Sequence, residues 1–255
     1  MVLPLLLSIP HCGIEVPPFI ADTMALNPAQ VAESEDHGTR EIFSGLPSLA
    51  CVAARWSRLV ADLNRRPDRY DDRGVIALAD YFGRRVFKLG QEPDPRETRQ
   101  RVEAYHRPYH RELTDNLALP GLRLLLDCHS MDGVGPSEAP DPGRVRCDVS
   151  LGNRGGPDGE AIPGKDEATC PASLIRGLAR ALEAQGLSVS LNQPYSGGYI
   201  TKHYGGLLRE QGKSSLQIEL NTDLYLTPQL AVDPVRLDQT RQAVWAALKD
   251  FARLL

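Results

Sequence analysis

Short apolar runs alternate with amphipathic stretches along the whole chain. The apolar runs lie between turn-forming or polar residues and are expected to be buried β-strands. These predicted strands span residues 3–9, 59–63, 122–126, 148–151, 189–191 and 215–220. The amphipathic stretches carry apolar residues at three- and four-residue spacing, which predicts helices. The predicted helices span residues 28–43, 96–117, 171–185 and 233–254.

Prolines and glycines divide these elements. Pro108 is expected to kink or restart the helix that contains it, because proline lacks a backbone N–H. Gly186 is placed to end the third helix, and a Gly-Gly pair at 197–198 predicts a turn. Residues 134–144 and 152–164 are rich in glycine or proline and are expected to be loops.

Strands that alternate with helices indicate an α/β fold. We expect a three-layer sandwich with a mixed, mainly parallel sheet. The chain has 255 residues, which is long enough to bury a sizeable core. It shows no internal repeat and no linker long enough to separate domains, so we expect residues 1–255 to form a single domain.

Charge and composition exclude several classes of partner. The 29 basic and 33 acidic residues give a formal charge of −4, and no basic run is present, which argues against nucleic acid. No apolar run reaches the roughly 18 residues of a membrane helix, so no membrane partner is expected. The five cysteines are scattered, which favours reduced thiols in a cytoplasmic protein.

Polar residues occur at or near the ends of four predicted strands. They are His11, the pair Asn64 and Arg65, His129, and Glu219 inside the last strand. Functional groups of open α/β sheets gather at the carboxyl ends of the strands. For any one of these residues, a hydrogen-bonded strand end is the more ordinary interpretation, but their joint occurrence favours a site.

His11 and His129 suit a zinc site. A catalytic zinc ion has three protein ligands and leaves a position for water. The third ligand is expected to be a carboxylate or a histidine, and either Glu15, four residues after His11, or Asp36 could serve. The remaining histidines are competing nitrogen donors: His37, His106, His110 and His203.

The segment Asp-Leu-Asn-Arg at 62–65 suits a substrate carboxylate. Arg65 offers a planar fork of donors, and Asn64 stands beside it. Glu219 lies in an apolar strand pattern, where burial would raise its pKa towards the range that suits proton transfer. These residues predict carboxylate binding beside a general base.

Several segments resemble the signature sequences of the N-formylglutamate amidohydrolases. They are Ser-Ile-Pro-His-Cys-Gly at 8–13, Arg-Val-Glu-Ala-Tyr-His-Arg-Pro-Tyr-His-Arg-Glu-Leu at 101–113, Asp-Cys-His-Ser-Met at 127–131, Gly-Gly-Tyr-Ile-Thr-Lys-His-Tyr-Gly at 197–205 and Gln-Ile-Glu-Leu at 217–220. The resemblance runs in order from about residue 3 to residue 226. That family is similar to zinc carboxypeptidases and aspartoacylase, so the resemblance implies a zinc carboxypeptidase-like fold.

The resemblance also implies roles for particular residues. It implies Zn²⁺ bound by His11, Asp36 and His129, with Glu219 as the catalytic acid and base. Asp36 is preferred to Glu15 because the family pattern has an Asp opening the next helix.

On the substrate side, the resemblance implies that Asn64 and Arg65 bind a carboxylate and that Lys202 and His203 face the substrate. The implied reaction is hydrolysis of the amide of an N-acyl amino acid, with N-formyl-L-glutamate giving glutamate and formate. The implied partner is therefore a small N-acyl amino acid.

Three alternatives remain. A non-catalytic carboxylate- or peptide-binding domain predicts loss of a zinc ligand or of the base, and all these residues are present. A related zinc carboxypeptidase or deacylase would act on another N-acyl amino acid. A cysteine hydrolase would use Cys12 or Cys128, although no accompanying base motif is seen.

Overall fold

The apolar runs at 3–9 and 122–126 form central strands of one sheet. The computed structural model describes residues 1–165 and 167–255. In this part of the chain six strands pair in the order β2-β1-β3-β6-β4-β5. Their bounds are β1 Leu3–Ile9, β2 Ser48–Ala53, β3 Leu124–Met131, β4 Val149–Gly152, β5 Val189–Leu191 and β6 Ser214–Asn221. Strands β4 and β5 run opposite to the other four, so the sheet is mixed and mainly parallel.

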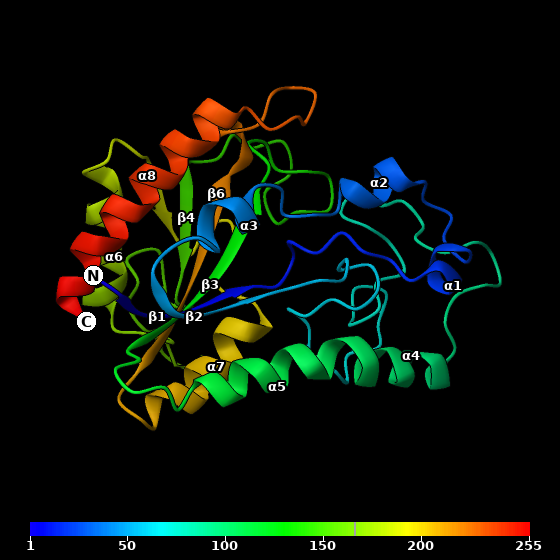
Figure 1. Ribbon diagram of the computed structural model, residues 1–255, viewed down its shortest axis with the longest axis horizontal. Helices are drawn as coiled ribbons and strands as arrows, with labels where there is room; N and C mark the ends of the chain where they lie inside the picture. Colours follow the sequence, from blue (N-terminus) through cyan, green and yellow to red (C-terminus); the bar gives the residue numbers. More distant parts are fainter. Residues whose placement is uncertain (166) are drawn as a thin grey trace.

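Helices cover both faces of this sheet (Figure 1). Helices α3, α6 and α8 lie on one face, and α5 and α7 lie on the other. The α-helices are α1 Pro18–Ala21, α2 Pro28–Ala32, α3 Thr39–Phe43, α4 Pro95–Arg101, α5 Arg107–Asn116, α6 Ala172–Glu183, α7 Tyr199–Arg209 and α8 Pro234–Phe251. Short 3₁₀ turns follow β6 and α8, at Thr222–Leu224 and Ala252–Leu254. The expected three-layer α/β sandwich is confirmed. No helix among the described residues is both long and apolar enough to span a membrane.

The helix predicted over residues 28–43 is wrong as a single element. The structure has two short helices there, α2 and α3, separated by a turn that contains Asp36. Gly38 has a left-handed backbone with φ of 76°, which a continuing α-helix does not allow. The break matters because it turns the Asp36 backbone towards β1, where its N–H donates to the His11 carbonyl oxygen at 3.0 Å.

The strand predicted over residues 59–63 is also wrong. These residues form turns, and the edge strand β2 lies earlier in the chain. Leu59 and Val60 instead belong to a second apolar cluster that includes Ile20, Phe87 and Val102. The loops that form this cluster lie together beyond the carboxyl ends of β1 and β2, on the right of Figure 1. They build one wall of the site described below.

The helix predicted over residues 96–117 is confirmed, but its winding changes just before Pro108. A π-helical segment, Val102–His106, connects α4 to α5, and Pro108 follows within the first turn of α5. The wider winding accommodates a residue that cannot donate a backbone hydrogen bond.

The predicted helices near α6 and α8 are confirmed with slightly shorter bounds. Helix α7 was not predicted, although the turn at 197–198 directly precedes it.

Candidate functional site

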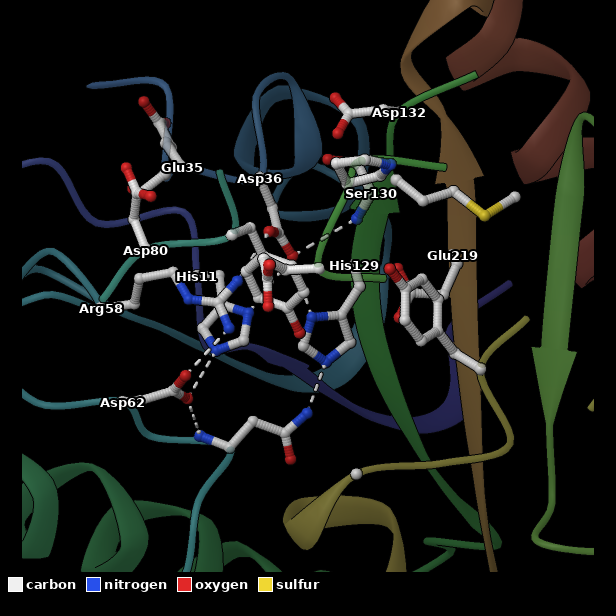
Figure 2. A pocket seen from close by; sticks show the side chains of 18 of the residues that line it. His11, Glu35, Asp36, Arg58, Asp62, Asp80, His129, Ser130, Asp132 and Glu219 are labelled. Atoms are coloured by element: carbon white, nitrogen blue, oxygen red, sulfur yellow. Dashed lines mark hydrogen bonds and ion pairs between the residues drawn. The ribbon is translucent and has the colours of Figure 1, made fainter. Parts of the chain in front are cut away.

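The strand-end residues singled out in the sequence line one cavity of about 720 Å³ (Figure 2). His11 follows β1, His129 lies near the end of β3, and Glu219 lies near the end of β6. Asn64 and Arg65 reach the same cavity from a loop rather than from a strand. These side chains therefore lie around one cavity, although not every supporting element is the predicted one.

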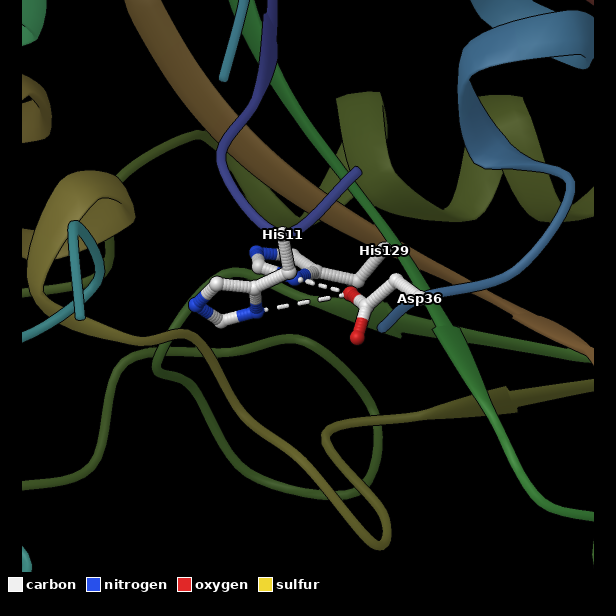
Figure 3. A group of neighbouring side chains, drawn as sticks. All are labelled: His11, Asp36 and His129. Carbon is white, nitrogen blue, oxygen red and sulfur yellow. Dashed lines mark hydrogen bonds and ion pairs between the residues drawn. The ribbon is translucent and has the colours of Figure 1, made fainter. Parts of the chain in front are cut away.

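His11, Asp36 and His129 form a compact buried group (Figure 3). One Asp36 carboxylate oxygen, Oδ2, lies 2.9 Å from His129 Nδ1 and 3.4 Å from His11 Nδ1. One possible ligand atom from each residue lies within 4.8 Å of the others. Glu15, the other candidate ligand, is exposed and pairs with Arg55, so the geometry favours Asp36.

The far side of each imidazole faces another aspartate. His11 Nε2 lies 2.9 Å from Asp62 Oδ1, and His129 Nε2 lies 3.2 Å from Asp127 Oδ1. Both rings thus turn Nδ1 towards Asp36 and Nε2 towards a carboxylate. Two imidazole nitrogens, one carboxylate and outer carboxylate partners are the donor set of a catalytic zinc site, so these residues fit the metal that the sequence implies.

Electrostatic coupling ties these groups together. Burial alone would raise the pKa of the Asp36 carboxyl, but His11 and His129 outweigh burial and hold that pKa far below its usual range. Burial would lower the pKa of His129, yet the facing aspartates, Asp127 first, raise it well above its ordinary value. In the metal-free chain these shifts favour a negative Asp36 beside a protonated His129, and a bound metal ion would take the place of the imidazole proton.

Glu219 stands directly across the sheet from His129, because the two residues are paired in the register of β3 and β6. Its side chain is almost fully buried, and burial raises the pKa of its carboxyl to about 8. Gln217 Nε2 donates a hydrogen bond of 2.6 Å to Glu219 Oε1. A carboxyl group that is oriented and readily protonated near neutral pH suits proton transfer.

Asn64 connects the histidine site to the start of helix α7. Its Oδ1 accepts a 2.8 Å hydrogen bond from the Ile200 N–H, and its Nδ2 lies 3.1 Å from His129 Nε2. A Cβ atom on Gly198 would lie 2.4 Å from Asn64 Nδ2, so only glycine allows this close approach. The predicted turn at 197–198 thus serves to bring α7 against Asn64.

Arg65 differs from the other arginines that line the cavity. Its guanidinium donates to the carbonyl oxygens of Asn64 and Arg73 and to the Tyr81 hydroxyl, which are all neutral acceptors. Among the described residues, no carboxylate forms an ion pair with Arg65. The other cavity arginines have such partners: Arg58 with Asp62, Arg69 with Asp71, Arg73 with Glu138 and Arg146 with Asp141. The charge of Asp62 raises the pKa of Arg65 without a direct ion pair, so the guanidinium can still donate to a ligand carboxylate.

Lys202 and His203 lie on α7 but are exposed and are not among the cavity-lining residues. The His203 ring stacks on Tyr199 at a centroid distance of 5.2 Å. His106 and His110 stack on each other nearby, at 4.2 Å. The geometry thus gives no support to substrate contact by Lys202 or His203, and that role stays a prediction.

His110 gives a prediction about stability. Its Nδ1 lies 2.9 Å from the Tyr204 hydroxyl and its Nε2 lies 2.9 Å from the Leu63 carbonyl oxygen. Burial lowers its pKa to about 3, so the folded chain keeps this ring neutral while the unfolded chain protonates it below about pH 6.5. The contribution of His110 to stability is therefore complete above pH 6.5 and decreases as pH falls.

Between pH 6.5 and pH 5, this one group should lower the free energy of unfolding by about 2 kcal/mol. Urea unfolding at both pH values measures the loss, and His110→Gln is the control because glutamine does not titrate. The wild-type protein should lose more stability than the variant. Equal losses in the two proteins would contradict the assignment.

Sequence reasoning missed Asp127 and Arg58. Asp127 lies two residues before His129 on β3, and strand alternation alone places the two side chains on the same face. That signal was available in the sequence. Arg58 Nη2 donates to Asp62 at 2.8 Å and its Nη1 lies 3.6 Å from Asp36, but its place in a turn gave no comparable signal.

The fold and the site together define an α/β-sandwich protein with a buried polar centre at the carboxyl ends of parallel strands. Residues 3–226 match the family model described as N-formylglutamate amidohydrolase. The chain belongs to this family.

Similar proteins and a similar solved structure support this family assignment. The chain is 30% identical over 241 residues to the N-formylglutamate deformylase of Pseudomonas aeruginosa, covering 89% of this chain and 83% of the relative. It is 31% identical to the N-formylglutamate deformylase of Pseudomonas putida, covering 88% and 82%. The crystal structure of N-formylglutamate amidohydrolase from Ralstonia eutropha JMP134 has a similar fold, with a TM-score of 0.77 at 22% identity over 99% of this chain and 94% of that one. These relatives indicate a hydrolase.

Proposed function

We propose that this protein hydrolyses the formamide bond of N-formyl-L-glutamate with a zinc ion held by His11, Asp36 and His129. The observation that carries the proposal is the Asp36-centred pair of histidines beside the buried Glu219. The names of the two Pseudomonas relatives support the choice of substrate.

Different residues would bind the metal ion, transfer the proton and bind the substrate. A zinc ion in this site would supply Lewis acidity and lower the pKa of a bound water. Glu219 accepts the proton of the attacking water and passes it to the departing amine nitrogen, because it lies across from His129 and is held by Gln217. Arg65, with Asn64 beside it, binds a carboxylate of the glutamate and so positions the amide.

Two other functional hypotheses have less support. A non-catalytic binding domain would not need a general base, yet Glu219 lies in the same cavity as the three possible metal ligands. A cysteine hydrolase would need a reactive thiolate. Burial raises the pKa of Cys12 to about 12 and that of Cys128 well above its usual value, so neither thiol ionises near neutral pH.

A substrate panel tests the proposed reaction. The zinc-loaded protein is assayed for amine release from N-formylglutamate, N-formylaspartate, N-acetylglutamate and a formylated apolar amino acid. We expect the highest kcat/KM for N-formylglutamate. A clear preference for another compound would assign the protein to a related deacylase, and no turnover of any compound would favour the binding domain.

Arg65 gives a second test of the substrate assignment. Capping the substrate carboxylates as amides should lower kcat/KM of the wild-type enzyme by about 10- to 100-fold, because a charge-assisted hydrogen bond is lost. The same capping should affect Arg65→Ala much less, since that variant has already lost the contact. Arg65→Lys should be intermediate because it keeps the charge but not the fork. Additive losses in this double-mutant cycle would show that Arg65 does not contact the carboxylate.

A further inference from the structure

Asp127 is a fully buried carboxylate that the proposed reaction does not use directly. It lies on β3 with 0% of its surface exposed, and its Oδ1 is 3.2 Å from His129 Nε2. A carboxylate in such a place is costly unless hydrogen bonds or a counter-charge compensate it. Among the described residues its one ion-pair partner is His129, and no lysine or arginine pairs with it.

Three further elements hold this carboxylate in place. Ser8, on β1, donates a 3.2 Å hydrogen bond to Asp127 Oδ1, and Thr201, on α7, donates a 3.0 Å bond to Oδ2. Tyr109, on α5, lies behind Ser8, with its hydroxyl 2.9 Å from Ser8 Oγ. Ser8, Tyr109 and Thr201 each belong to a segment that the sequence marked as characteristic. Directly or through Ser8, these residues fix the position of the Asp127 carboxylate.

Two neighbours of His129 Nε2 favour different tautomers of the imidazole ring. Asn64 Nδ2 is a donor, 3.1 Å away, and its orientation is fixed because Asn64 Oδ1 accepts from Ile200. It favours the neutral tautomer with the proton on Nδ1, which would then donate to Asp36. Asp127 is an acceptor and favours the proton on Nε2, which leaves the Nδ1 lone pair directed towards Asp36 and available to a metal ion.

We propose that Asp127 is a positioning residue that selects the metal-binding tautomer of His129. Asp62 lies closer to His11, with a hydrogen bond of 2.9 Å to its Nε2, whereas Asp127 acts on His129 through its charge at 3.2 Å. The inference rests on the metal site of the proposed function. Outer carboxylates of this kind fix the tautomer and orientation of a ligating histidine and raise its basicity.

Asp127→Asn tests this role, because it removes the charge and keeps the shape. The variant should bind zinc about 10- to 100-fold more weakly than the wild type. Zinc affinity is measured by competition with a chromophoric chelator at a temperature where circular dichroism shows folded protein. Asp148→Asn is the control, since it removes the same charge just before β4 from a carboxylate that accepts from Ser188 and not from a histidine, and it should bind zinc within about twofold of the wild type.

Affinity separates this role from a purely structural one. If Asp127 only stabilises the fold, Asp127→Asn will lower the unfolding temperature of the metal-free protein but bind zinc as the wild type does, which overturns the proposal.

Should this variant fail to fold, Ser8→Ala combined with Thr201→Val loosens the carboxylate and keeps its charge. Weaker zinc binding by this double variant supports the proposal, and unchanged binding overturns it. A wild-type chain without stoichiometric zinc binding would refute the proposed metal site as well, whereas normal wild-type binding limits any failure to Asp127.

Discussion

Glu219→Gln is expected to lower kcat by a factor of about 10² to 10⁴ while the protein folds and retains its zinc. The substitution keeps the size of the side chain and preserves an oxygen that can accept the hydrogen bond from Gln217. It removes the one group in the cavity that is placed across from His129 and has a pKa raised to about 8 by burial. Proton transfer is then lost without loss of the fold.

Steady-state kinetics and elemental analysis of the same preparation measure this effect. Glu210→Gln is the matched control, because it makes the same chemical change on an exposed residue at the end of α7. The control should have normal turnover and normal zinc content. Near-normal turnover in Glu219→Gln would exclude Glu219 as the general base.

His129→Ala is expected to lose nearly all bound zinc and with it most activity. The wild-type protein should contain about one zinc ion per chain. Zinc contributes several kcal/mol of transition-state stabilisation, and about 4 kcal/mol corresponds to a 10³-fold loss of rate. His11→Ala should behave in the same way, because both rings direct Nδ1 to Asp36.

His203→Ala provides the comparison for metal content. His203 is exposed on α7 and lies outside the His11–Asp36–His129 group, so this variant should keep its zinc. Full metal content in both His11→Ala and His129→Ala would place the zinc elsewhere. Loss of zinc in His203→Ala as well would show that alanine substitution of histidine disturbs the protein in general.

The strand-end residues were predictable because their signal is local. His11, His129 and Glu219 each lie in or directly after an apolar run, and parallel strands bring such positions to one edge of a sheet. The choice between Glu15 and Asp36 is not local. It depends on the segment between α2 and α3, where the Asp36 N–H donates to the carbonyl oxygen of His11. From the residues alone both carboxylates were acceptable, and only the family resemblance favoured Asp36.

Tertiary packing explains the elements that sequence patterns assigned wrongly. The run at 59–63 looked like a strand because it is short and mostly apolar, but Leu59, Val60 and Ala61 pack in the second apolar cluster and Leu63 packs in the main core. Helix α7 contains Gly205 and Gly206, which lower helix propensity. A Cβ atom on Gly205 would lie 2.6 Å from Thr169, so close packing of the helix against its neighbour requires this glycine. Local propensity could not predict a helix that packing stabilises.

Arg58 has a consequence for how this site can change during evolution. Its guanidinium contacts Asp36, which lies between the two histidines, and Asp62, which supports His11. Replacing Arg58 would leave the buried carboxylates of Asp36 and Asp62 without this cation, which is expected to be strongly destabilising. We therefore expect that substitutions tolerated in the loop of Asp36 depend on the residue at position 58, and the reverse. Arg69 and Arg73 also line the cavity, but their ion pairs are exposed and contribute little to stability, so these positions should accept substitutions more easily.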